Sequence, residues 1–186
     1  MKRIFLASAA LALPAMMAAC SSAGLSGPEQ AAVQQNADMS EAMQDEVSEL
    51  NRLTRIYIDA AALYKQAADI PDETNGLKPV LLDLAKKRNA HRDALQKRVI
   101  AVGAVPAEHG EALGTAHRAF TSLRTVVDKD TEVAVEEVLR GERYILDEIN
   151  KAMAKAVTPE TRTLLSQLRT DADAEIARLE AIDKAA

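Results

Sequence analysis

Residues 43–68 read MQDEVSELNRLTRIYIDAAALYKQAA, in which an apolar or small side chain recurs every three or four positions. The recurring residues are Met43, Val47, Leu50, Leu53, Tyr57, Ala61, Tyr64 and Ala68. Because an α-helix turns once in 3.6 residues, this spacing places them all on one face. The pattern therefore predicts an amphipathic helix over Met39–Ile70, with Asp38 and Glu41 as a capping box at its start.

Two further stripes of the same kind follow. The second predicted helix runs from Leu77 to Val102, between breakers at Asn75-Gly76 and Gly103. Its stripe consists of Leu77, Leu81, Leu84, Arg88, His91, Leu95, Val99 and Val102. The third predicted helix opens near Thr131, and its stripe consists of Val135, Val138, Glu142, Ile145, Ile149 and Met153.

The fourth predicted helix has the clearest start, Thr158-Pro159-Glu160. Threonine is a favoured N-cap, proline suits the first helical position, and glutamate is stabilised beside the positive end of the helix. The stripe of this helix consists of Leu165, Leu168, Ala172, Ile176, Leu179 and Ile182.

Four helices of roughly 25–30 residues each span about 40 Å, and their matched lengths predict one four-helix bundle. The short links inside the first and second pairs predict two antiparallel hairpins. The link over 103–130 is long enough to run the length of the bundle, and residues 113–127 add a short amphipathic segment to it. A single long crossover is the ferritin-like arrangement. We therefore predict an all-α, ferritin-like four-helix bundle over residues 38–186, with a long, partly helical crossover.

The N-terminus resembles a bacterial lipoprotein export signal. Lys2-Arg3 precede an apolar run, Ile4–Leu13, which is too short to cross a bilayer. Small residues then lead to Cys20, the only cysteine. We predict a signal peptide over 1–19, lipidation of Cys20, and a flexible tether over 20–37. Ser21 favours the outer membrane, facing the periplasm. The alternative is an ordinary cleaved signal in which Cys20 is incidental.

Composition narrows the function classes. The chain has 28 acidic and 23 basic side chains, a formal net charge of −5. This acidic balance argues against nucleic acid or an anionic lipid surface as partner. The sequence contains neither a Gly-x-Ser-x-Gly nucleophile elbow nor a phosphate-binding loop, so we predict no enzymatic activity and no cofactor.

Polar residues interrupt the stripes near mid-helix. Arg88, His91 and Glu142 lie on predicted core faces, and Asp59 and Asp171 flank theirs. Ferritin-like di-metal sites use Glu-x-x-His pairs, but the residue three before His91 is the cation Arg88. We interpret the layer as a structural Arg88–Glu142 salt bridge with a hydrogen-bonded His91. Two alternatives stay open, namely a metal site built from Glu142, His91, Asp59 and Asp171, and a small-molecule pocket.

Four short motifs resemble an uncharacterised bacterial family of ferritin-like four-helix-bundle proteins, a domain of unknown function. They are Leu50-Asn51-x-Leu53, Gly114-x-x-His117-Arg118-x-Phe120, Arg140-Gly141-Glu142 and Pro159-Glu160-x-Arg162. The resemblance covers about Leu50 to Ile182 and implies the fold more than a function. The chain departs from the family at Ala61, Lys86 and Asp173, where relatives tend to carry acidic or histidine side chains. This departure implies that the chain has fewer residues able to bind a ligand than its relatives.

Together these features predict a lipid-anchored, non-catalytic binding or structural module of the cell envelope, acting in envelope stress or maintenance. The competing hypothesis is a divergent ferritin-like iron- or manganese-binding protein. The expected partners are the membrane, through the lipid anchor, and an envelope protein or a second copy. Dimerisation would use an apolar strip formed by Ile56, Leu63 and Ile70, which recurs every seven residues. The favoured alternative is that this strip belongs to a wide core face of the helix.

Overall fold

The computed structural model describes residues 39–68, 76–110 and 131–184. These residues form four long helices and no strand: α2 (Glu41–Ala68), α3 (Leu77–Ala101), α5 (Thr131–Lys155) and α6 (Pro159–Asp183). The predicted all-α four-helix bundle is confirmed, with helix ends within two residues of those expected. Several predicted features lie outside the described residues: the signal peptide, Cys20, the tether, Asp38 of the capping box, and the crossover motif around His117.

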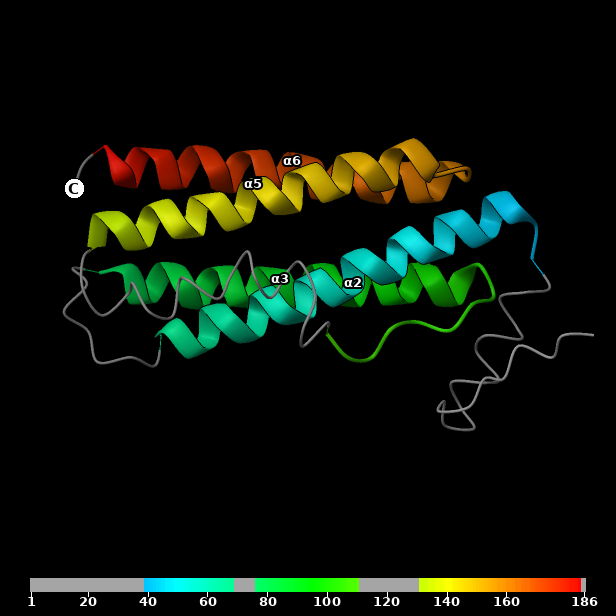
Figure 1. Ribbon diagram of the computed structural model, residues 1–186, viewed down its shortest axis with the longest axis horizontal. Helices are drawn as coiled ribbons and strands as arrows, with labels where there is room; N and C mark the ends of the chain where they lie inside the picture. Colours follow the sequence, from blue (N-terminus) through cyan, green and yellow to red (C-terminus); the bar gives the residue numbers. More distant parts are fainter. Residues whose placement is uncertain (1–38, 69–75, 111–130, 185–186) are drawn as a thin grey trace, which may run out of the picture.

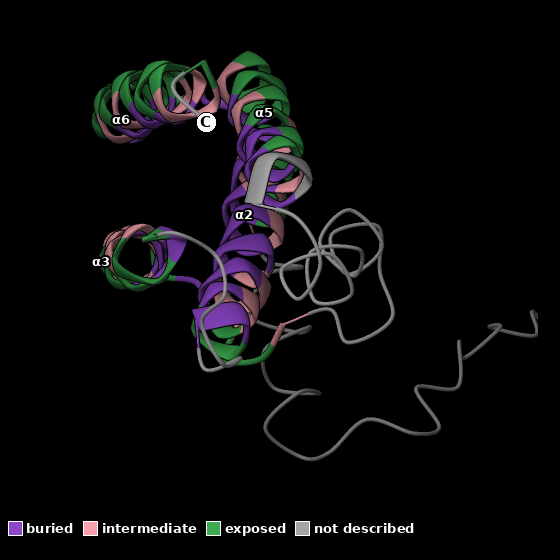
Figure 2. Ribbon diagram, turned by 90° about the vertical axis from the view of Figure 1, so that its left-hand side faces the viewer, coloured by how far each residue is buried: buried purple, intermediate pink, exposed green. Residues whose placement is uncertain are grey.

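The helices lie side by side along the long axis of the molecule (Figure 1). α2 and α3 form one antiparallel hairpin and α5 and α6 the other, as the short links predict. Seen end on, the helices follow the order α3, α2, α5, α6 around an open ring (Figure 2). The backbones of α3 and α6 approach each other at few points, so mainly side chains connect these two helices.

The core is continuous through the bundle, because the predicted stripes of all four helices point inward. Its largest fully buried apolar side chains include Leu50, Leu53, Ile56, Leu81, Leu84, Leu95, Ile145 and Ile149. Ile56 is only 1 % exposed, so at this position the strip belongs to a wide core face, which was the favoured alternative to a dimerisation surface. Leu63 is partly buried against the same core, and Ile70 lies outside the described residues. The apolar face of α2 is simply wider than its period-3.6 stripe.

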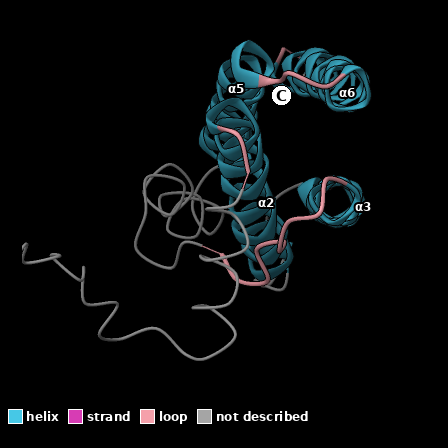
Figure 3. Ribbon diagram, turned by 90° about the vertical axis from the view of Figure 1, so that its right-hand side faces the viewer, coloured by secondary structure: helices cyan, strands magenta, loops and turns pink. Residues whose placement is uncertain are grey.

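The crossover begins along the side of α2. Gly103 has φ +82°, which favours glycine and ends α3 where the sequence predicts. Residues 102–110 then turn back, shown as a loop beside the helices in Figure 3. The Asn51 side chain holds this segment: its amide nitrogen donates to Val105 O at 3.1 Å, and its oxygen accepts from Ala107 N at 2.7 Å. The path agrees with a connection that runs along the bundle.

No helix in the described part of the chain is long and apolar enough to cross a membrane.

Candidate functional site

The centre of the bundle holds an ion pair between α3 and α5. Arg88 and Glu142 are both 0 % exposed. Arg88 Nε donates to Glu142 Oε1 at 3.2 Å, and its Nη2 forms a closer ion pair with Oε2. Burial opposes the charge of Arg88, but the facing carboxylate outweighs it and raises the pKa of the guanidinium. The predicted Arg88–Glu142 pair is therefore present, and it is fully desolvated.

A tyrosine from α2 completes the hydrogen bonding of the carboxylate. The Tyr64 hydroxyl donates to Glu142 Oε1 at 2.8 Å, and its side chain is completely buried. Burial, together with the nearby Glu142 charge, raises the pKa of Tyr64 well above its usual value, so the phenol remains a neutral donor. The spacing of Tyr64 within α2 predicts only that it lies on the apolar stripe. Its position opposite an acidic residue of another helix is not visible from spacing within α2.

His91 links the ion pair to the surface of α6. Arg88 Nη1 lies 3.0 Å from His91 Nδ1, and Asp171 Oδ2 lies 3.2 Å from His91 Nε2. Because a guanidinium has only donors, Nδ1 must accept, and the imidazole hydrogen is placed on Nε2, facing Asp171. The layer thus runs from Tyr64 through Glu142, Arg88 and His91 to Asp171, and it joins all four helices.

Tyr57 packs over the middle of this layer. Its ring meets the His91 ring edge-on, with centroids 5.5 Å apart, and lies 5.6 Å from the Arg88 guanidinium carbon. Both contacts have the geometry of favourable aromatic and cation–π interactions. The buried Tyr57 hydroxyl has no hydrogen-bond partner among the described residues.

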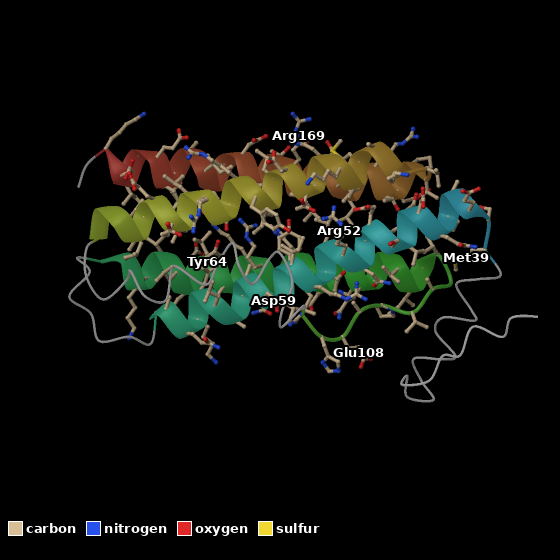
Figure 4. All side chains as sticks on the ribbon, in the orientation of Figure 1. Met39, Arg52, Asp59, Tyr64, Glu108 and Arg169 are labelled. Carbon is tan, nitrogen blue, oxygen red and sulfur yellow. The ribbon has the colours of Figure 1, made fainter. Side chains whose placement is uncertain are left out.

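Asp59, which was predicted to flank the apolar stripe of α2, is half-buried and lies beside the start of the crossover. It lies on the crossover side of α2 (labelled in Figure 4), where its carboxylate sits against Gly110 so closely that a Cβ at that position would collide with it. Asp59 is only two residues from Tyr57, a rotation of about 200° around the helix, which points it away from the core face. Asp171 reaches the layer only through His91, and its side chain is 38 % exposed.

The donor set does not suit a divalent cation. Arg88 stands between Glu142 and His91, so a cation there would replace the guanidinium at both residues or face its charge. Among the described residues no group of three or more His, Cys, Asp or Glu side chains is arranged to hold a metal ion. The geometry instead provides a neutralised, hydrogen-bonded layer that sets the register of four helices.

A groove of about 620 Å³ lies elsewhere, between α5 and the last turns of α6. Its lining is mostly charged, and Arg143 in it pairs with Glu180 at 2.9 Å. It therefore lacks the apolar lining that is usual for small-molecule sites.

A second buried polar cluster, which the sequence analysis missed, lies at the end of the bundle where α6 begins. The Glu46 carboxylate of α2 accepts hydrogen bonds from the backbone N–H groups of Val157 (2.6 Å) and Thr158 (2.9 Å). It also accepts from the hydroxyls of Thr158 (2.7 Å) and Thr161 (2.6 Å). Arg98 of α3 donates to both of these hydroxyls. Thr158 is the N-cap residue, but its own side chain makes no capping bond. Glu46 instead accepts from the backbone N–H groups of the two residues that precede α6.

These contacts explain the ionisation of Glu46. Burial alone would raise the pKa of its carboxyl group, but the hydrogen bonds from Thr161, Thr158 and Val157 together lower it. Glu46 therefore stays charged below the usual range of a glutamate. The only sequence signal was its position, one turn before Leu50 on the core side of the stripe.

Residues 45–155 match the family described as Domain of unknown function (DUF2383). The chain belongs to this family. A search of curated proteins found no match. The DUF2383 match contains α3, α5 and nearly all of α2, and with them Arg88, His91, Glu142 and Glu46. It ends before α6, so Asp171 and Thr161 lie outside it.

The contacts of His91 predict that its imidazole has a pKa below the usual value of a histidine. Burial, followed by the adjacent Arg88 charge, lowers the pKa of His91 below its usual 6.5, while Asp171 partly opposes the shift. The folded state then binds fewer protons than the unfolded chain, so stability falls as the pH drops from 6.5 through the lower folded pKa. We expect NMR of the imidazole to show the Nε2–H tautomer and a midpoint below 6.5. An Nδ1–H tautomer, or a raised midpoint, would contradict the Arg88–His91 hydrogen bond. His91→Gln should flatten this part of the pH dependence.

Proposed function

We propose that this DUF2383 protein is a lipid-anchored module of the cell envelope that binds or organises other components and catalyses no reaction. The observation that carries the anchoring is the N-terminal sequence, in which a short apolar run leads through Met17-Ala18-Ala19 to Cys20. Acylation with two or more chains makes such attachment nearly permanent. We place the module at the outer membrane, facing the periplasm, and we regard its bundle as ferritin-like because of the crossover path along α2.

The non-catalytic part of the proposal is supported by the state of the buried polar groups. The functional groups of Arg88 and Glu142 are both engaged with each other and shielded from solvent. His91 accepts at one nitrogen and donates at the other, and so has no free base position. A general base needs access to a substrate proton, which this arrangement does not offer.

Anchoring is tested by expressing the full chain in a bacterium that processes lipoproteins. We expect the protein to partition into the detergent phase and to show the mass of a chain that begins at an acylated Cys20. Cys20→Ser should move the protein to the aqueous phase and remove the acyl mass, whereas Ser21→Ala, the matched control, should retain both. A wild-type protein in the aqueous phase, cut elsewhere or not at all, would reject the proposed anchor.

A further inference from the structure

The charge of this acidic chain is distributed unevenly, and α3 is strongly basic. α3 carries seven lysines and arginines against two aspartates, a net charge of +5, while the whole chain has −5. The net charge of the chain therefore says little about what α3 can meet. A local cluster of charges of one sign affects a contact at that surface more than the net charge of the whole chain does.

The basic residues of α3 that point inward are neutralised. Arg88 pairs with Glu142, Lys87 lies 2.5 Å from Glu175, and Arg98 Nη2 lies 3.9 Å from Glu46. In these contacts, carboxylates of α2, α5 and α6 neutralise the positive charges on the inward side of α3. They do not account for the lysines on the opposite side of the helix.

The outward side of α3 carries a strip that we call the α3 outer strip, and all its members are exposed. It consists of Lys78, Leu82, Lys86, Ala90, Asp93, Lys97 and Ile100. At 3.6 residues per turn these positions occupy about one third of the helix circumference, opposite Leu84 and Leu95. α3 stands at the edge of the molecule in Figure 2, and none of the described helices covers this face.

The three lysines of the strip differ from the exposed cations of α5, which are all paired. Lys78, Lys86 and Lys97 make no ion pair with a described residue, whereas Arg143 pairs with Glu180 and Lys155 pairs with Asp45. The single acid within the strip, Asp93, is already 2.7 Å from Arg92.

Apolar side chains alternate with these free lysines. Leu82 is 43 % exposed and Ile100 is 59 % exposed, two of the most exposed large apolar residues in the described part of the chain. A face that combines lysines with protruding leucine and isoleucine suits the boundary between lipid headgroups and acyl chains. Interfaces between proteins also combine charged and apolar side chains, so an acidic protein is the alternative partner that the experiment below distinguishes.

We propose that the α3 outer strip rests on a membrane surface rich in anionic lipid headgroups, so that the anchored bundle lies on its side. This inference rests on the membrane anchorage proposed above, because three lysines alone favour the contact by only about a hundredfold. The tether supplies the high local concentration that makes so weak a contact effective. A bundle lying on α3 would turn α5 and the groove near Arg143 away from the membrane.

Lysine footprinting tests this contact without any substitution. Cys20 is the only cysteine, so the full chain can be coupled through it to maleimide lipids, whether or not a cell acylates it. Vesicles of phosphatidylcholine are compared with vesicles that also contain phosphatidylglycerol, and mass spectrometry follows acetylation at each lysine. We expect Lys78, Lys86 and Lys97 to react at least about threefold more slowly on the anionic vesicles, and to recover at high salt.

Lys151 and Lys155 of α5 serve as controls and should react equally on both vesicles, since their side chains are 64 % and 54 % exposed away from α3. Equal reactivity of the α3 lysines on both vesicles would overturn the proposal and point to an acidic protein as the partner. Equal slowing at α3 and α5 would also overturn it, because the contact would then have no preferred face. Neither result would bear on lipidation in the cell, which the detergent-partition experiment decides separately.

Discussion

Replacing Arg88 with methionine is expected to lower the free energy of unfolding by about 3–5 kcal/mol, because it leaves the Glu142 carboxylate buried without its counter-ion. Both side chains are 0 % exposed, so water cannot replace the guanidinium without opening the core. The same substitution removes the donor to His91 Nδ1. Denaturant unfolding followed by circular dichroism measures the loss.

A second variant, in which both charges are removed, tests whether the ion pair stabilises the bundle or whether only an unpaired buried charge destabilises it. Changing Arg88 and Glu142 together to apolar residues would remove the carboxylate to which the Tyr64 hydroxyl donates. The appropriate variant is therefore Arg88→Met, Glu142→Met and Tyr64→Phe. We expect its stability to lie within about 2 kcal/mol of the wild type or above it, since desolvation of a buried pair offsets much of its attraction. A triple variant as unstable as Arg88→Met alone would show that the pair itself stabilises the bundle.

Removing the carboxylate of Glu46 is expected to have the second largest effect. Glu46→Ala should cost about 3 kcal/mol, because two backbone N–H groups at the start of α6 and two hydroxyls lose a charged acceptor. Hydrogen exchange should increase first in the opening turn of α6. Glu49→Ala is the matched control on α2: its side chain is 25 % exposed and pairs with Arg52, so its loss should cost at most about 1 kcal/mol.

The same carboxylate should contribute to acid unfolding. Because the folded pKa of Glu46 lies below the usual 4.5, its contribution is complete above that pH and is lost as the pH falls through the lower folded value. Glu46→Gln should therefore reduce the fall in stability on the acid side of pH 4.5. An unchanged acid profile in this variant would mean that Glu46 is not held as a carboxylate by the α6 turn.

The sequence was sufficient for the helices and for one tertiary pair. Apolar spacing located all four helices, and Pro159 marked the start of α6 to the residue. Arg88 and Glu142 could be paired because each interrupts an apolar stripe near the middle of its helix, and a buried charge requires an opposite one. These inferences depend only on periodicity and on the cost of burying charge.

The features that could not be predicted from the sequence concern the direction of a side chain around its helix and contacts between segments that are distant in the chain. The position of Asp59 beside Gly110 could not be predicted, because the sequence does not say on which side of α2 the crossover passes. The two interpretations of the strip through Ile56 could not be separated from the sequence, because only the structure shows that α2 faces both α3 and α5 and so buries a wider arc than one stripe. Glu46 was missed because its partners, Val157 and Thr158, are more than 110 positions away in the chain.

The two hydrogen bonds of Asn51 have a consequence for the handedness of the bundle. A chain leaving α3 could return past either neighbouring helix, and the two routes would give mirror-related connections around nearly the same core. The apolar stripes cannot distinguish these routes, since both bury the same side chains. Asn51 can, because its amide offers one donor and one acceptor to the backbone of residues 105–107 on a single side of α2. This buried side chain, together with Gln96 of α3, which donates to Ala107 O at 2.8 Å, thus fixes the side of α2 along which residues 105–107 run.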